Sequence, residues 1–271
     1  MTDLVRPVDL SFKGDVAWLT LNRPDEFNAI NLETAEALLR NVGLISTEGS
    51  RVAVISGAGG TFCSGGDVVE MAEASNLSTY VRQLAGTFHD ALIKLAELNA
   101  VIIAAVDGVA AGGGLGLALA ADIQLASDRS MFLTSYESLG LTPDSGTSFL
   151  LPRSIGISQA RQMSATGMRL DATFAAGIGL VHKVVRPDEL PDAASELASR
   201  LAARPQLHMS QTRTLFWGAD SGEYRRHLDA ERDAISDVAR TPQVAALISE
   251  VAARAVRSRA ARRKRTGRHV S

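Results

Sequence analysis

The sequence predicts an α/β fold for residues 1–200, followed by a helical region over residues 201–258. Short apolar runs that end at turn residues alternate with amphipathic helical patterns through the first two-thirds of the chain, as they do where helices connect parallel strands. After Pro187 the pattern changes to alanine-rich helical stretches without a further strand signal. The chain has 271 residues, of which 46% are hydrophobic and 21% charged, so it is long enough for one large folded domain.

The predicted strands and helices follow one another in a regular order. The apolar run at residues 16–21 is the first expected strand, and Asn31 is expected to cap a helix over residues 32–42. Further strands are expected at residues 51–56, 101–106 and 123–126, and further helices at residues 80–98, 115–121, 190–203, 224–238 and 242–255. This alternation followed by helices alone predicts a core domain with a helical C-terminal appendage.

Charge is distributed unevenly along the chain. Lys and Arg total 28 against 30 Asp and Glu, but eight of those basic residues fall between Arg254 and Ser271, where there is no acid. The rest of the chain is therefore strongly acidic and would repel a nucleic-acid backbone, so no nucleic-acid partner is expected. We expect residues 259–271 to be a disordered, solvated basic tail.

Cysteine use and hydropathy indicate a cytoplasmic protein. The single cysteine, Cys63, cannot form an internal disulfide, which points to a reducing compartment. Residues 1–13 lack the apolar block of a signal peptide, and the least polar stretch, residues 108–121, is shorter than the roughly 20 residues that span a bilayer. No membrane association is expected.

Neither of the two glycine clusters has the spacing of a nucleotide-binding loop. The spacing G-x-G-x-x-G would need a glycine at Leu117 when counted from Gly112, and at Phe62 when counted from Gly57. No glycine is followed by the Lys-Ser or Lys-Thr pair of a phosphate-binding loop, and the histidines lack metal-ligand spacing. Neither a bound cofactor nor a metal is predicted.

The same glycines could instead bring backbone N–H groups close to a substrate oxygen. Each cluster follows a predicted strand and opens a predicted helix, and amides at helix N-termini are unpaired with partial positive charge. Two such amides could form an oxyanion hole, which stabilises a carbonyl oxygen that gains negative charge. Close packing of helix on strand explains the glycines equally well.

Three segments resemble the signature blocks of the crotonase (enoyl-CoA hydratase/isomerase) superfamily. They are FCSGGDVVEM (62–71), DGVAAGGG (107–114) and GLTPDSG (140–146), and LNRP (21–24) and GLVHKVV (179–185) extend the similarity over most of the chain. The resemblance implies a spiral of ββα units, a helical C-terminal trimerisation region, and acyl-CoA thioester substrates that bring coenzyme A with them. It also implies that the amides of Gly66 and Gly113 hold the thioester oxygen.

The chain departs from family hydratases at the reacting groups. Those enzymes carry glutamates at the positions that match Gly116 and Tyr136 here, so water addition by a glutamate pair is hard to sustain. Asp144 remains, at a position that resembles the catalytic acid of family isomerases, although an Asp after Pro is also a common turn or cap residue. A single carboxylate can accept and return a proton, which favours an enoyl-CoA isomerase.

Two alternatives stay open. His89, Tyr136 and Asp144 occupy positions similar to the water-activating histidine, an aromatic residue and the nucleophile of 4-chlorobenzoyl-CoA dehalogenases. Tyr136 replaces a tryptophan and Gly66 a bulkier residue of that site, and a lone helical histidine is often structural. The other alternative is an acyl-CoA-binding protein without catalytic activity.

The resemblance also implies coenzyme A contacts and an assembly. Arg23, Phe27 and Ala29 correspond to residues near the nucleotide end, and Ser64, Asp67 and Val68 to the pantetheine channel. Arg254 aligns loosely with a basic residue that reaches the phosphates of coenzyme A. An ordinary surface arginine would explain this position equally well. Amphipathic C-terminal helices fit a homo-oligomer, either a trimer or a dimer of trimers.

Overall fold

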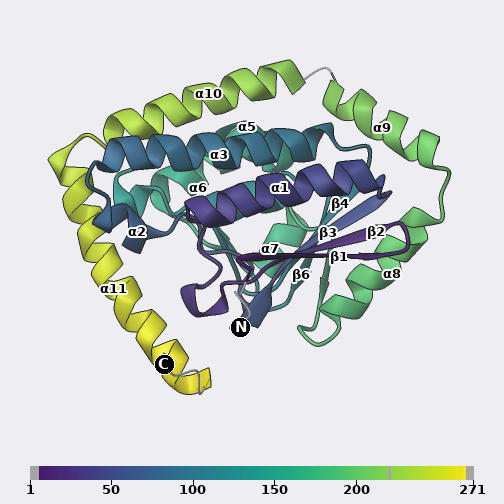
Figure 1. Ribbon diagram of the computed structural model, residues 1–271, viewed down its shortest axis with the longest axis horizontal. Helices are drawn as coiled ribbons and strands as arrows, with labels where there is room; N and C mark the ends of the chain where they lie inside the picture. The colour runs from purple at the N-terminus through teal and green to yellow at the C-terminus, as the bar shows by residue number, and fades with distance from the viewer. Residues whose placement is uncertain (1–5, 219–220, 267–271) are drawn as a thin grey trace.

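The computed structural model describes residues 6–218 and 221–266, and Figure 1 shows helices packed around a central sheet. The mixture of strands and helices confirms the α/β class predicted from the sequence. Across these described residues, no helix combines the length and the apolar character needed to cross a membrane.

The main sheet has six strands in the order β1-β2-β3-β4-β6-β9. Strands β1 and β2 are antiparallel and every other neighbouring pair is parallel. The strands are β1 (Val8–Lys13), β2 (Val16–Leu21), β3 (Val52–Gly57), β4 (Val101–Val106), β6 (Ile123–Ser127) and β9 (Lys183–Val185). The four predicted strands are β2, β3, β4 and β6; β1 escaped prediction because most of its side chains are exposed, and β9 because it is only three residues long.

Strand β4 shows where the core lies. All six of its residues are buried, because both faces of the sheet are covered. Ile102 and Ala104 face the cluster that contains apolar residues of α1 (Leu32–Glu48) and α3 (Leu77–Glu97). On the opposite face, Ile103 packs in the cluster that includes α8 (Leu190–Ala202).

A small second sheet fixes the first glycine loop. It consists of β5 (Val109–Ala111), β7 (Met131–Leu133) and β8 (Leu170–Asp171). An isolated bridge joins Cys63 to Ala110 of β5, and another joins Ile30 to Gly66. The loop that carries Gly66 is therefore held on both sides by backbone hydrogen bonds before α2 (Val68–Glu73) begins.

Asn31 caps α1 as predicted. Its Oδ1 accepts a hydrogen bond of 2.9 Å from the Thr34 N–H. The helix runs beyond the predicted end at residue 42 and stops at Gly49, which has a φ of 67°. The remaining α-helices before α8 are α4 (Gly113–Leu119), α5 (Thr147–Ile155), α6 (Ile157–Thr166) and α7 (Ala172–Gly177).

The C-terminal region is helical, as predicted, and returns to the core. It comprises α9 (Gln206–Gly218), α10 (Ser221–Val238) and α11 (Pro242–Thr266). Figure 1 shows α10 lying along α3, while α11, in yellow, descends past α2 to the N-terminal part of the chain.

The expected disordered tail over residues 259–271 needs correction. Residues 259–266 are the last turns of α11, and residues 267–271 lie outside the described part of the chain. The arginines are ordered because they meet acidic and aromatic partners: Arg259 pairs with Asp67 at 2.6 Å, Arg263 pairs with Glu26 at 2.5 Å, and the Arg262 guanidinium lies 4.8 Å from the centre of the Phe27 ring.

Candidate active site

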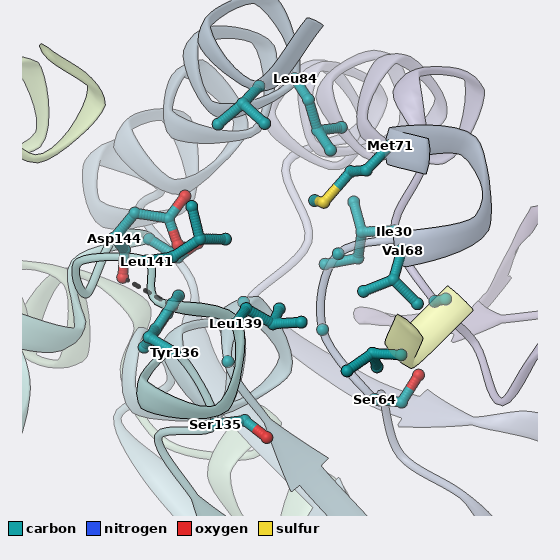
Figure 2. A pocket seen from close by; sticks show the side chains of 18 of the residues that line it. Ile30, Ser64, Val68, Met71, Leu84, Ser135, Tyr136, Leu139, Leu141 and Asp144 are labelled. Carbon is teal, nitrogen blue, oxygen red and sulfur yellow. Dashed lines mark hydrogen bonds between the residues drawn. The ribbon is translucent and has the colours of Figure 1, made fainter. Parts of the chain in front are cut away.

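A cavity of about 330 Å³ opens where both glycine loops meet the segment that contains Asp144. Its walls are mostly apolar, with side chains from α2, α3, α10 and α11. Figure 2 shows Asp144 and Leu141 on one side of this space and Ile30, Val68 and Met71 on the other. The arrangement suits an apolar group held beside a single carboxylate.

Hydrogen bonds made by the residues on either side of Gly66 hold its loop in place, and the Gly66 N–H takes no part in them. The N–H of Ile30 donates to the carbonyl of Gly65 at 2.8 Å, and the N–H of Asp67 donates to the carbonyl of Ile30 at 2.9 Å. Gly65 must be glycine, because its φ is 97° and a Cβ there would lie 2.9 Å from the Ala111 carbonyl oxygen. Within the described residues, the Gly66 N–H donates to no protein acceptor.

Gly113 presents an equivalent amide from the second loop. It is the first residue of α4, so its N–H has no partner inside the helix. A Cβ on Gly65 would lie only 3.5 Å from the Gly113 nitrogen, which shows how closely the loops approach. Both Gly66 and Gly113 line the cavity.

Asp144 lines the same cavity and is only 9% exposed. Ser145 Oγ donates to Asp144 Oδ1 at 2.8 Å, and Tyr136 Oη donates to the Asp144 carbonyl at 3.0 Å (Figure 2). Burial raises the pKa of Tyr136 well above its ordinary value, so this hydroxyl stays protonated as a donor. Tyr136 thus anchors the backbone of Asp144 and also lines the cavity.

His89 lies behind Asp144 and does not line the cavity. Its Nε2 accepts a 3.0 Å hydrogen bond from the backbone N–H of Ser145, and lies 3.8 Å from Asp144 Oδ2. A ring nitrogen that accepts from an amide carries no proton, so this hydrogen bond requires the tautomer with its hydrogen on Nδ1. In this arrangement His89 orients the turn after Asp144, and its Nε2 is not available to a water molecule.

Comparison with known proteins identifies the family. Residues 11–246 match the family described as "Enoyl-CoA hydratase/isomerase". The chain belongs to this family. The crotonase resemblance inferred from the glycine loops and the Asp144 segment is thereby confirmed, and the protein is an enzyme of the enoyl-CoA hydratase/isomerase family.

Relatives in this family include hydratases and isomerases. The chain is 38% identical to "Probable enoyl-CoA hydratase echA12" of Mycobacterium bovis over 228 residues, covering 81% of this chain and 80% of the relative. It is 31% identical to "Trans-2-decenoyl-[acyl-carrier-protein] isomerase" of Streptococcus mutans, covering 83% and 87%. A crystal structure of an enoyl-CoA hydratase/isomerase from Mycobacterium paratuberculosis superposes with a TM-score of 0.85 at 25% identity, covering 92% and 99%.

The family resemblance assigned seven residues to coenzyme A, and the structure brings four of them to the cavity: Phe27, Ala29, Ser64 and Val68. Asp67 is fully buried behind the wall, where it caps α2 by accepting from the Val69 N–H at 3.1 Å. Arg23 pairs with Asp67 at 3.1 Å. These two residues support the loop that contains Gly66.

Arg254 does not line this cavity. It is exposed and pairs with Glu250 on its own helix at 2.7 Å. Arg259 lines the cavity instead, together with Val251, Ala255 and Ser258 of α11.

Two further residues were missed by the sequence analysis. Arg259 lines the cavity, and its guanidinium pairs with the buried Asp67 at 2.6 Å. Glu231 of α10 is buried against the turn after Asp144, where it accepts from the N–H groups of Gly146 and Ser148. The periodicity of α10 carried a signal for Glu231, because it lies on the face that Tyr224, Leu228 and Ile235 share at spacings of three and four residues.

Proposed function

We propose that this protein is an enoyl-CoA isomerase, in which the amides of Gly66 and Gly113 hold the thioester oxygen and Asp144 moves the proton. The observation that carries the proposal is the single carboxylate beside the apolar part of the cavity. The other acidic residue lining it, Glu26, is paired with Arg263. A proton shuttle needs one such group, whereas hydration by paired carboxylates needs two.

The shift of a double bond follows from this geometry. The Asp144 carboxylate takes a proton from the carbon next to the thioester carbonyl of a 3-enoyl-CoA, and the electron pair of that C–H bond delocalises onto the thioester oxygen. Hydrogen bonds from the two glycine amides would stabilise the resulting dienolate. The carboxylic acid then returns the proton to the fourth carbon, giving the 2-enoyl-CoA without any cofactor besides the coenzyme A of the substrate.

Interconversion of 3-enoyl-CoA and 2-enoyl-CoA by the wild type and by Asp144→Asn tests the proposal. Asparagine keeps the size of the side chain and cannot take the proton, so kcat should fall by about 10²- to 10⁴-fold. Asp188→Asn changes an exposed acid that pairs with Arg186 and should leave the rate unchanged. Undiminished isomerisation by Asp144→Asn would refute the role of Asp144, and thioester binding without turnover would favour a non-catalytic binding protein.

We also propose that α9 forms a contact between copies of the chain. Leu215 and Phe216 are 80% and 83% exposed, and Leu207 on the same helix is 73% exposed. Large apolar side chains gathered on one helix are typical of an interface. Light scattering should give a trimer or a dimer of trimers for the wild type and a smaller species for Phe216→Asp; equal masses would contradict this contact.

A further inference from the structure

The turn that carries Asp144 has an unfavourable backbone conformation. Ser145 and Gly146 follow Asp144 with φ values of 59° and 75°, so two consecutive residues lie in the left-handed region and one of them is not glycine. Such a conformation persists only where surrounding groups hold it. The groups that do so determine where the Asp144 carboxylate points.

The carboxylate of Glu231 accepts hydrogen bonds from the residues just after Ser145. Its Oε2 accepts from the Gly146 N–H at 2.7 Å, and its Oε1 accepts from the Ser148 N–H at 3.0 Å and from Ser148 Oγ at 2.5 Å. Glu231 is 5% exposed and does not line the cavity. It therefore acts on the turn and not on the substrate.

A carboxylate from another helix is needed here because α5 cannot cap itself. Its N-cap residue, Gly146, has no side chain, and a Cβ there would lie 2.5 Å from Tyr224 Oη. The unpaired N–H groups at the start of α5 and their partial positive charge are instead satisfied by Glu231. Both oxygens of the carboxylate are used, each by a different backbone amide.

The surroundings of Glu231 make its charge sensitive to pH near neutrality. Burial is the main reason that its pKa rises to about 7, and the negative charge of Asp144 adds to this, while the hydrogen bonds from Ser148 and Gly146 oppose it. The titratable groups that face it from the packed elements are Asp144 and Tyr136, His89 of α3, and Tyr224 and His227 of α10.

We propose that Glu231 is a positioning residue, which orients Asp144 for proton transfer by holding the amides of Gly146 and Ser148. The proposal rests on the function proposed above for Asp144. Glu231 thereby gives a helix of the C-terminal region a role in the reaction. Its hydrogen bonds to the turn are 2.5 to 3.0 Å long, and it does not contact the substrate.

The experiment compares wild type, Glu231→Gln and Glu223→Gln, using kcat and KM for 3-enoyl-CoA between pH 5.5 and 8.5. Glutamine replaces one carboxylate oxygen by an NH2 group, which only donates, so one of the two backbone amides would face another donor. We expect kcat of Glu231→Gln to fall by about 10-fold or more with KM within about threefold of wild type, since the binding walls stay intact. Glu223, an exposed acid of the same helix 3.8 Å from Arg153, is the matched control and should behave as wild type.

The pH profile separates positioning from a general loss of structure. Protonation removes one acceptor oxygen, so wild-type kcat should fall with an inflection near pH 7 as the pH is lowered, and Glu231→Gln should lack this inflection. Ser148→Ala removes one hydrogen bond to Glu231 Oε1 and should lower kcat by a smaller factor, which provides a second test if Glu231→Gln folds poorly.

The outcomes separate this inference from the proposed function. An inactive wild type would refute the isomerase proposal. An active wild type with kcat of Glu231→Gln within twofold across the pH range would overturn the positioning role of Glu231 alone. If Ser148→Ala had the same kcat and the same pH profile as wild type, the positioning role of Glu231 would be overturned as well.

Discussion

Gly116 on α4 lies against Ser145 so closely that a Cβ on Gly116 would be 2.3 Å from the Ser145 carbonyl oxygen. The turn that carries Asp144 therefore occupies the space where any side chain at position 116 would begin. The family resemblance places a glutamate of hydratases at this position. A glutamate at position 116 and the observed turn exclude each other, because a side chain there would displace the turn that places Asp144 beside the cavity.

Gly116→Ala should lower both stability and activity. A methyl group at 2.3 Å from a backbone oxygen forces the turn to move, and overpacking of this kind costs about 1 to 3 kcal/mol. Gly43→Ala on α1 is the matched control, because its nearest contact would be Lys94 Nζ at 3.7 Å and alanine stabilises a helix interior by about 0.5 to 1 kcal/mol. Urea denaturation and isomerase assays measure both effects. Equal stability of the two variants would show that the turn adapts.

Hydrolysis of 4-halobenzoyl-CoA should not occur. That reaction needs a histidine to take a proton from water, and the Nε2 of His89 already accepts the Ser145 N–H at 3.0 Å. Halide release from the chloro, bromo and iodo thioesters measures the activity directly. Halide release by the wild type that disappears in His89→Gln would reinstate the dehalogenase alternative.

The glycine loops and Asp144 were predicted from the sequence, whereas Arg259 and Glu231 were not. The glycine loops follow strands that local patterns reveal, Asp144 was indicated by the family resemblance, and the structure brings them to one cavity. Arg259 and Glu231 reach that region from helices far along the chain, and local periodicity carries no information on which distant loop a helix will meet. The same reason explains the tail, because its charge suggested solvation while Asp67 and Glu26 supply partners.

Arg259→Ala should weaken binding of the acyl-CoA more than it slows the reaction. Arg259 lines the cavity, where its guanidinium is placed to contact the coenzyme A part of the substrate. Loss of a hydrogen bond from a charged group costs about 1.5 to 3 kcal/mol, which predicts a rise in KM of about 10-fold or more. Arg254→Ala removes an exposed arginine of the same helix and should leave KM unchanged. Equal KM values for both variants would contradict the assignment.

Stability should depend on pH through Glu231. Its pKa rises from an ordinary value of 4.5 to about 7 in the folded protein, mainly because of burial. Between these two pH values the folded state keeps the proton while the unfolded state releases it, so the stabilising contribution is complete below pH 4.5 and is lost as the pH rises through about 7. Wild type should therefore lose up to about 3 kcal/mol relative to Glu231→Gln over this window, because glutamine does not titrate. Urea denaturation of both proteins at pH 5, 6, 7 and 8 measures the difference. A difference that stays constant from pH 5 to pH 8 would mean that Glu231 is already ionised in the folded protein at pH 5, stabilised by the amides of Gly146 and Ser148 more than burial opposes it.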